Sequence, residues 1–153
     1  MAEVAVRLAA KAYAAGQRLL VLGDAAELAA LDLALWTQSK ASFIAHGLAG
    51  GPHDAAQPIL LSPRLELVNR ASRLEPVNGA NRLEPVNGAR VLLLLGHGLP
   101  PEFDGLDRLL NLFDDGMPSH ARARADWKAI GTRHGVERSY WQQSIRGGWE
   151  KKA

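Results

Sequence analysis

Short runs of apolar residues, spaced along the chain between segments with helical periodicity, constrain its fold more than any other feature. The run from Val91 to Leu95 is the longest of them, and an unbroken apolar run is typical of a strand covered on both faces of a parallel sheet. It is far shorter than the roughly 20 residues that cross a bilayer. Because parallel strands need long crossover connections, usually helices, the alternation predicts an α/β fold with a largely parallel sheet.

Caps and turn residues place the individual elements. The alanine-rich segment 3–15 is a predicted helix that ends at Gly16, and a second helix begins at Asp24, whose spacing from Glu27 matches a capping box. The other expected elements are a helix over 118–134, strands over 18–22, 42–45, 58–61, 90–95 and 136–142, and either a strand or a helix over 106–113. Strands that alternate with helices again favour layered α/β architecture.

A nine-residue sequence occurs three times in the middle of the chain, as RLELVNRAS (64–72), RLEPVNGAN (73–81) and RLEPVNGAR (82–90). The unit is shorter than the ~20 residues of most solenoid repeats, and the proline and the Asn-Gly turn of the second and third copies oppose a long helix. We therefore expect 64–90 to be a tandem expansion lodged in a loop, because closure entropy grows slowly with loop length. A short β-ribbon that turns at each Asn-Gly is the alternative.

The length of 153 residues fits a single domain. The absence of cysteine excludes a disulfide scaffold, a thiolate zinc site and a cysteine nucleophile. No secretory signal is recognisable, so a cytoplasmic protein is expected. The net charge of +2 is unevenly distributed, because Ser119 to the C-terminus carries eight Lys/Arg and three Asp/Glu and ends in a basic tail over 147–153. This segment predicts an acidic partner, or else only a solvated helix face.

The sequence contains neither of the glycine-rich loops by which parallel α/β folds bind phosphate. Gly96-His97-Gly98 follows the strand 90–95, where such folds often bind ligands, but a turn explains it better. His46 and His53 lie on either side of a loop, without a third ligand at zinc spacing. We therefore expect a protein that is not an enzyme, with no catalytic residue, no metal and no cofactor. A degenerate nucleotide-binding enzyme is the alternative.

The predicted third helix carries a row of cations beside an aromatic residue. Arg124 and Lys128 are i, i+4 neighbours, His120 lies one turn before Arg124, and Trp127 borders the same face. Such a row can bind an acidic peptide with an apolar terminus, or a phosphate backbone with stacked bases. Alternatively, Trp127 packs into the sheet and the cations are only solvated.

Two further aromatic residues are candidates for an interface. Trp36 lies at the end of the predicted second helix, and Phe43 follows a short polar link. Aromatic residues in such places usually belong to the core. Those beside a loop at a helix end also frequently anchor interfaces.

Four segments follow one another along the chain: LLVLGDAAELAALDLALWTQSKASFIAH, PILLS, NGARVLLLLGHGLP and ARADWKAIGTRHGVERSYWQQ. In this order they resemble the chi subunit of bacterial DNA polymerase III holoenzyme, from about Val6 to the C-terminus apart from the repeat. The ending GGWEKKA looks like that of alphaproteobacterial members. The resemblance implies a single domain over 1–153 with a Rossmann-like sheet and no nucleotide site. It also implies a non-catalytic accessory subunit that acts in DNA replication.

The resemblance further implies partners and site residues. Proteins of this family connect the clamp loader, through the psi subunit, to the acidic C-terminal tail of single-stranded DNA-binding protein. The arginine, aromatic residue and lysine of the family's tail-binding pocket match Arg124, Trp127 and Lys128. The other residues expected at this pocket are His120, Ile130 and Val136, and those that match the psi-facing surface are Trp36 and Phe43.

The chain departs from the family at its N-terminal end. Members begin with a strand before the first helix, whereas this chain starts almost in the helix at Glu3. We therefore expect that strand to be missing, which would leave an exposed edge or a vacancy beside the strand 18–22. The alternative function, from a different class, is direct binding of single-stranded nucleic acid by the basic third helix.

Overall fold

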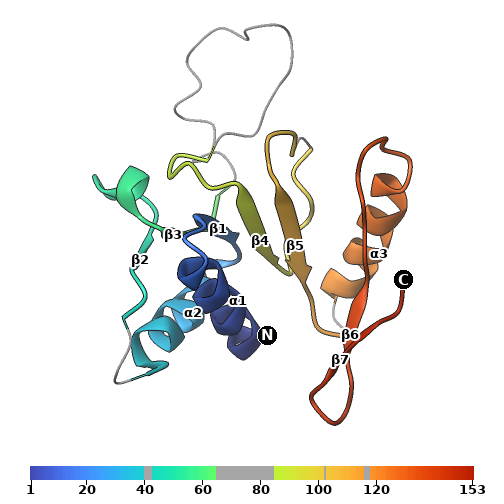
Figure 1. Cartoon of the computed structure of the whole chain (residues 1–153), viewed down its shortest axis with the longest axis horizontal. Coiled ribbons are helices and arrows are strands. Elements are labelled where there is room, and N and C mark those ends of the chain that lie inside the picture. The colour runs from blue at the N-terminus through green and yellow to red at the C-terminus, as the bar shows by residue number, and fades with distance from the viewer. Residues whose placement is uncertain (40–42, 65–84, 102, 116–117) are drawn as a thin grey trace, which may run out of the picture.

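Five parallel strands form one sheet in the order β2–β3–β1–β4–β5 (Figure 1). The computed structural model describes residues 1–39, 43–64, 85–101, 103–115 and 118–153. The strands are β1 (Leu19–Leu22), β2 (His46–Leu48), β3 (Ile59–Ser62), β4 (Val91–Leu95) and β5 (Arg108–Leu112). The predicted α/β class and its Rossmann-like parallel sheet are confirmed.

Two helices cover one face of the sheet, and the third helix lies beyond one of its edge strands. α1 (Ala2–Ala14) and α2 (Ala25–Thr37) lie against the same face, and α3 (Pro118–Ile130) lies beyond β5 (Figure 1). The remaining elements are the 3₁₀ turn η1 (Asp54–Ala56) and an antiparallel hairpin of β6 (Trp141–Gln143) and β7 (Trp149–Lys151). None of the helices in the described ranges combines the length and apolar character that crossing a membrane requires.

The core has two sides because successive strand residues point to opposite faces of the sheet. On the helical side, Leu19, Val21 and Leu93 pack against apolar residues of α1 and α2. On the other side, apolar residues of β1, β3 and β4 pack against loop residues, which include Val86, Leu99 and Leu106. All five residues of β4 are buried, as the apolar run predicts.

The sequence signals at the end of the first helix and at the start of the second are confirmed. The backbone N–H of Asp24 donates to the carboxylate of Glu27 at 3.4 Å, which is one half of a capping box at the start of α2. Gly16 follows α1 with a φ of +67°, a conformation that favours glycine at the end of a helix. These two signals mark the end of α1 and the start of α2.

The strand predicted over 42–45 is wrong over its described part, because Phe43 to Ala45 form no strand and β2 begins at His46. Ser42 lies outside the described residues. The side chain of Ile44 is buried among residues of α1 and α2. Gly47 lies so close to Gln57 that a Cβ there would come within 2.9 Å of the Gln57 side chain. Contacts with β3 and with Gln57, which local sequence does not reveal, therefore select the position of β2.

The C-terminal third also differs from its prediction. α3 ends at Ile130 rather than near His134, and the Thr132 hydroxyl donates to the carbonyl oxygen of Ala129, which competes with a further helical turn. The expected strand over 136–142 is confined to its end, where β6 pairs with β7 rather than with the main sheet. The segment 147–153 is therefore not a free tail, since it contains β7. The ambiguous segment 106–113 contains strand β5.

The vacancy expected beside the strand 18–22 is not present, because β1 pairs with β3 on one side and with β4 on the other. The edges of the sheet are β2 and β5. At the start of β5, the Arg90 guanidinium donates two hydrogen bonds to Asp107, at 2.7 and 2.8 Å. These bonds lower the pKa of the exposed Asp107 carboxyl. The pair connects the residues that directly precede β4 and β5.

Most of the nine-residue repeat, 65–84, lies outside the described residues, so both hypotheses for it stay predictions there. The end of the third copy forms a turn, in which the Gly88 N–H donates to the Pro85 carbonyl at 2.8 Å. Asn87 is 1% exposed, and Ala89 is buried against the sheet. This part of the repeat is a loop, as expected, but it belongs to the core of the domain.

Candidate partner-binding site

α3 is held against the loop that follows β4. The backbone N–H of Leu99 donates to the Asp126 carboxylate at 3.2 Å, and Ala123 is buried. Gly98 faces the same helix, where a Cβ would approach the Arg122 side chain to 3.0 Å. Because these contacts fix one side of α3, its other side is free to present the cations of Arg124 and Lys128, which are both exposed.

Trp127 packs against the segment that follows its own helix. The guanidinium of Arg138 lies 4.5 Å from the centre of the indole ring and also donates to the Trp127 carbonyl oxygen. The ring of Tyr140 meets the indole edge-on, with centroids 6.5 Å apart. A cation over an indole face and an edge-on aromatic pair are both favourable arrangements. The hypothesis that Trp127 packs into the sheet is therefore replaced by packing between α3 and the approach to the hairpin.

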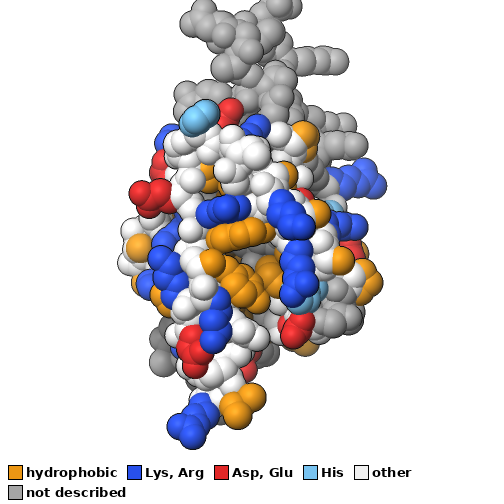
Figure 2. Space-filling view, turned by 90° about the vertical axis from the view of Figure 1, so that its right-hand side faces the viewer, with side chains coloured by type: hydrophobic (Ala, Val, Ile, Leu, Met, Phe, Trp, Pro, Cys, Tyr) orange, Lys and Arg blue, Asp and Glu red, His pale blue; other side chains and the backbone are white. Residues whose placement is uncertain are grey.

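These residues line a groove that has α1 and β5 on one side and α3 with the hairpin on the other. Figure 2 views the molecule from the side of α3 and the hairpin, and it shows hydrophobic side chains gathered in a hollow with Lys and Arg side chains on both sides of it. Arg124, Lys128 and Arg138 are three of the cations that line the groove. Within the described part of the chain, neither Arg124 nor Lys128 has a carboxylate within 4.0 Å. Their charges are available to a partner.

The other residues expected at this pocket line the same groove but differ in character. His120 contacts other residues of the chain, since its Nδ1 lies 2.8 Å from an Asp115 carboxylate oxygen and its ring stacks on Phe113 with centroids 5.5 Å apart. It therefore does not extend the row of free cations. Ile130 is half-buried and Val136 is exposed, so both contribute apolar surface.

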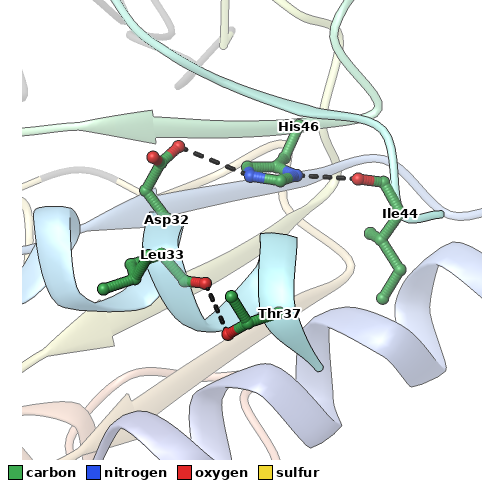
Figure 3. Close-up of polar contacts among 5 residues, drawn as sticks. All are labelled: Asp32, Leu33, Thr37, Ile44 and His46. Atoms are coloured by element: carbon green, nitrogen blue, oxygen red, sulfur yellow. Dashed lines mark hydrogen bonds and ion pairs between the residues drawn. The ribbon is translucent and has the colours of Figure 1, made fainter. Parts of the chain in front are cut away.

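The second pair of candidates lies at the opposite end of the molecule. The rings of Trp36 and Phe43 have centroids 5.5 Å apart, and the two side chains are 57% and 63% exposed. His46 lies behind them, 5.0 Å from the Trp36 ring. Its Nδ1 donates to the Ile44 carbonyl at 2.7 Å, and its Nε2 lies 3.4 Å from Asp32 of α2 (Figure 3). The buried imidazole thus supports an exposed aromatic pair.

Sequence reasoning missed the residues that assemble these two surfaces. Arg138 and Tyr140 connect α3 to the hairpin, and the Tyr140 ring also stacks on Phe113 at 6.4 Å. The only signal for them was an arginine and an aromatic residue in the segment predicted as the last strand. The contact of His46 with Asp32 joins positions 14 apart, and no spacing rule predicts it.

Side chains that follow β1 and β4 contact each other at the end of the sheet where parallel α/β folds usually bind ligands. His97 follows β4 and lies 3.6 Å from Asp24, which follows β1. Gly96 faces the first turn of α3, where a Cβ would meet Ser119 at 3.5 Å. Among the described residues, no group of three or more His, Cys, Asp and Glu side chains is placed to hold a metal ion.

Comparison with known proteins identifies one family. No curated protein matches the chain. The family model described as "DNA polymerase III chi subunit, HolC" matches residues 1–137, which include the sheet and α3 and end just before the hairpin. The match covers most of the chain, so this protein belongs to the DNA polymerase III chi subunit family, whose members are non-catalytic accessory subunits of that polymerase.

Proposed function

We propose that this chain connects the clamp loader of DNA polymerase III to single-stranded DNA-binding protein by binding the acidic C-terminal tail of that protein in the groove beside α3. The observation that carries the proposal is that cations without an ion-pair partner lie beside apolar side chains in one groove. Arg124 and Lys128 have no carboxylate within 4.0 Å in the described residues, and Trp127, Ile130 and Val136 line the same groove.

The chemistry of the tail matches both parts of the groove. A tail of aspartates that ends in phenylalanine and a free carboxylate needs cations beside an apolar cleft. A guanidinium can bind the terminal carboxylate with two hydrogen bonds, which are stronger than neutral ones. The phenylalanine ring can then bury its surface in the hollow (Figure 2). Recognition of an acidic motif and recognition of a C-terminal carboxylate are both recurrent modes of peptide binding.

A titration of the full chain with a synthetic acidic peptide that ends in phenylalanine tests the proposal. Raising the ionic strength from about 0.1 M to about 1 M shortens the Debye length from about 10 Å to about 3 Å. We expect the affinity to fall at least about tenfold over this range, because the cations are exposed. The same peptide without its phenylalanine should bind weakly at both ionic strengths. Absence of peptide binding, combined with tight binding of a single-stranded oligonucleotide, would replace this function with direct nucleic-acid binding.

We further propose that Trp36 and Phe43 form the surface that binds the psi subunit, or the clamp-loader component that takes its place. The support is the exposure of two aromatic rings in contact with each other. Tryptophan is enriched among the residues that dominate binding energy at interfaces. Trp36 contacts His46 of β2, whereas α3 lies beyond β5, and these two strands are opposite edges of the sheet (Figure 1). We therefore expect both partners to bind at once.

Replacing Phe43 with serine is expected to weaken binding of the psi subunit by about 30-fold, since loss of an interface anchor costs about 2 kcal/mol. Stability should change by less than about 0.5 kcal/mol, because the ring is mostly exposed. Ile145→Ser provides the control, as Ile145 is a fully exposed apolar residue in the turn of the hairpin. Titration calorimetry measures both variants. Equal effects of the two substitutions would contradict the assignment.

A further inference from the structure

The hairpin places two tryptophans and a lysine on one of its faces. Trp141 pairs with Lys151, and Gln143 pairs with Trp149. Directly opposed residues of an antiparallel pair share a face, and alternate residues of a strand return to it. We call this face the inner face; its residues are Trp141, Gln143, Trp149 and Lys151. All four line the same groove as Arg124 and Trp127.

Contacts with α3 and with Phe113, the residue that follows β5, hold the hairpin beside the groove. Tyr140, directly before β6, touches Trp127 with its ring edge and stacks on Phe113. The open end of the hairpin is closed by backbone hydrogen bonds, because the Lys152 N–H donates to the Tyr140 carbonyl at 2.8 Å and the Tyr140 N–H donates to the Ala153 carbonyl at 2.8 Å. The inner face is therefore a wall of the groove held in a defined position.

The inner face has surface and charge left for a partner. Trp141 is 50% exposed and Trp149 is 41% exposed. Glu150 lies on the opposite face and pairs with Lys152, whose Nζ is 2.7 Å from its carboxylate. Lys151 has no carboxylate within 4.0 Å in the described ranges. The one acidic group of β7 is thus neutralised, and the cation that faces the groove is free.

We propose that the inner face of the hairpin is a second subsite of the groove, which binds the acidic residues that precede the terminal phenylalanine of the tail. The proposal rests on the tail-binding function above and extends it to residues beyond the family match, which ends at 137. Charge complementarity and continuity with Arg124 and Lys128 along one groove support this occupant. When the C-terminal end of an extended peptide binds beside Arg124, the acidic residues that precede it can reach Lys151.

The arrangement of the aromatic residues favours a peptide over single-stranded nucleic acid. Proteins that bind single strands without sequence preference place successive bases on a series of aromatic side chains along a cationic groove. Here Trp141 and Trp149 lie on different strands, and the inner face carries one cation. A peptide needs only apolar walls and a cation at the position of its carboxylates.

The test compares two peptides on the full chain by fluorescence anisotropy. The short peptide carries only the terminal phenylalanine and the residue before it, and the long peptide adds the acidic segment. Lys151→Glu is expected to weaken the long peptide by about fivefold and to leave the short one unchanged, because exposed charge pairs contribute up to about 1 kcal/mol. Trp149→Ala should lower only the affinity of the long peptide as well. Arg146→Glu makes the same charge change in the hairpin but outside the groove lining, so it is the matched control.

The outcomes separate this inference from the function on which it rests. If the wild-type chain binds neither peptide, the tail-binding function itself fails. If both peptides bind wild type equally well, or if Lys151→Glu and Arg146→Glu have the same effect, the second subsite is wrong and the first remains. Loss of oligonucleotide binding in Lys151→Glu and Trp149→Ala, with the affinity of the long peptide unchanged, would assign the inner face to nucleic acid instead. Unchanged binding of the short peptide also shows that the variants are folded.

Discussion

Asn87→Ala is expected to destabilise the domain by about 2–4 kcal/mol, because it removes three hydrogen bonds in a buried place. The Asn87 side-chain nitrogen donates to the Leu19 carbonyl at 3.1 Å and to the Gln57 carbonyl at 3.2 Å. Its oxygen accepts from the Ala89 N–H at 3.3 Å. One amide therefore joins the start of β1, the residues before β3 and the loop before β4. Urea unfolding measures the effect as a lower midpoint with an unchanged slope.

A second asparagine provides the control for this prediction. Asn111 lies on β5, and its Oδ1 is buried without a hydrogen-bond partner among the described residues. Asn111→Ala should cost less than about 1 kcal/mol, because it breaks no hydrogen bond of that oxygen. If both variants lost the same free energy of unfolding, the effect would reflect truncation alone, and the bridging role of Asn87 would be wrong.

The strands and helices that sequence reasoning placed correctly are those with a strong local signal. Unbroken apolar residues mark 91–95, and caps at Asp24 and Gly16 mark helix ends. β2 has no such signal, because His-Gly-Leu is short, contains glycine and becomes a strand through its pairing with β3. The hairpin was missed for a related reason. β6 and β7 pair only with each other, and the alternation of residues in 136–142 does not show which strand is its partner.

The site divides in the same way. The positions of Arg124, Trp127 and Lys128 on one helix follow from spacing, which needs no knowledge of the fold. The residues that shape their surroundings come from elsewhere, since Arg138 and Tyr140 reach Trp127 across a turn that sequence reasoning treated as helix. The repeat gave no sign that Asn87 has a role of its own. Three near-identical copies suggested one role for all of them, yet burial in the described part distinguishes this residue.

The largest effect on function is expected for Arg124→Glu, which should weaken binding of the acidic tail peptide by about 30-fold or more. A charge-assisted hydrogen bond to a carboxylate contributes about 1.5–3 kcal/mol, and the substitution adds repulsion at the same position. About 2 kcal/mol corresponds to roughly 30-fold in affinity. The fold should be unaffected, because the Arg124 side chain is exposed and makes no ion pair within the described residues.

Arg122→Glu separates a local contact from a general change of charge. Arg122 is exposed on the same helix, but it lies against Gly98 and outside the groove lining. Both variants lower the net charge by the same amount, so long-range attraction of an acidic peptide falls equally in both. A direct contact with the peptide predicts a much larger loss for Arg124→Glu, and that difference should persist at high salt, where long-range terms are screened. Equal losses that vanish together with added salt would mean that the peptide senses only the charge of α3, and the pocket would have to be sought elsewhere along the groove.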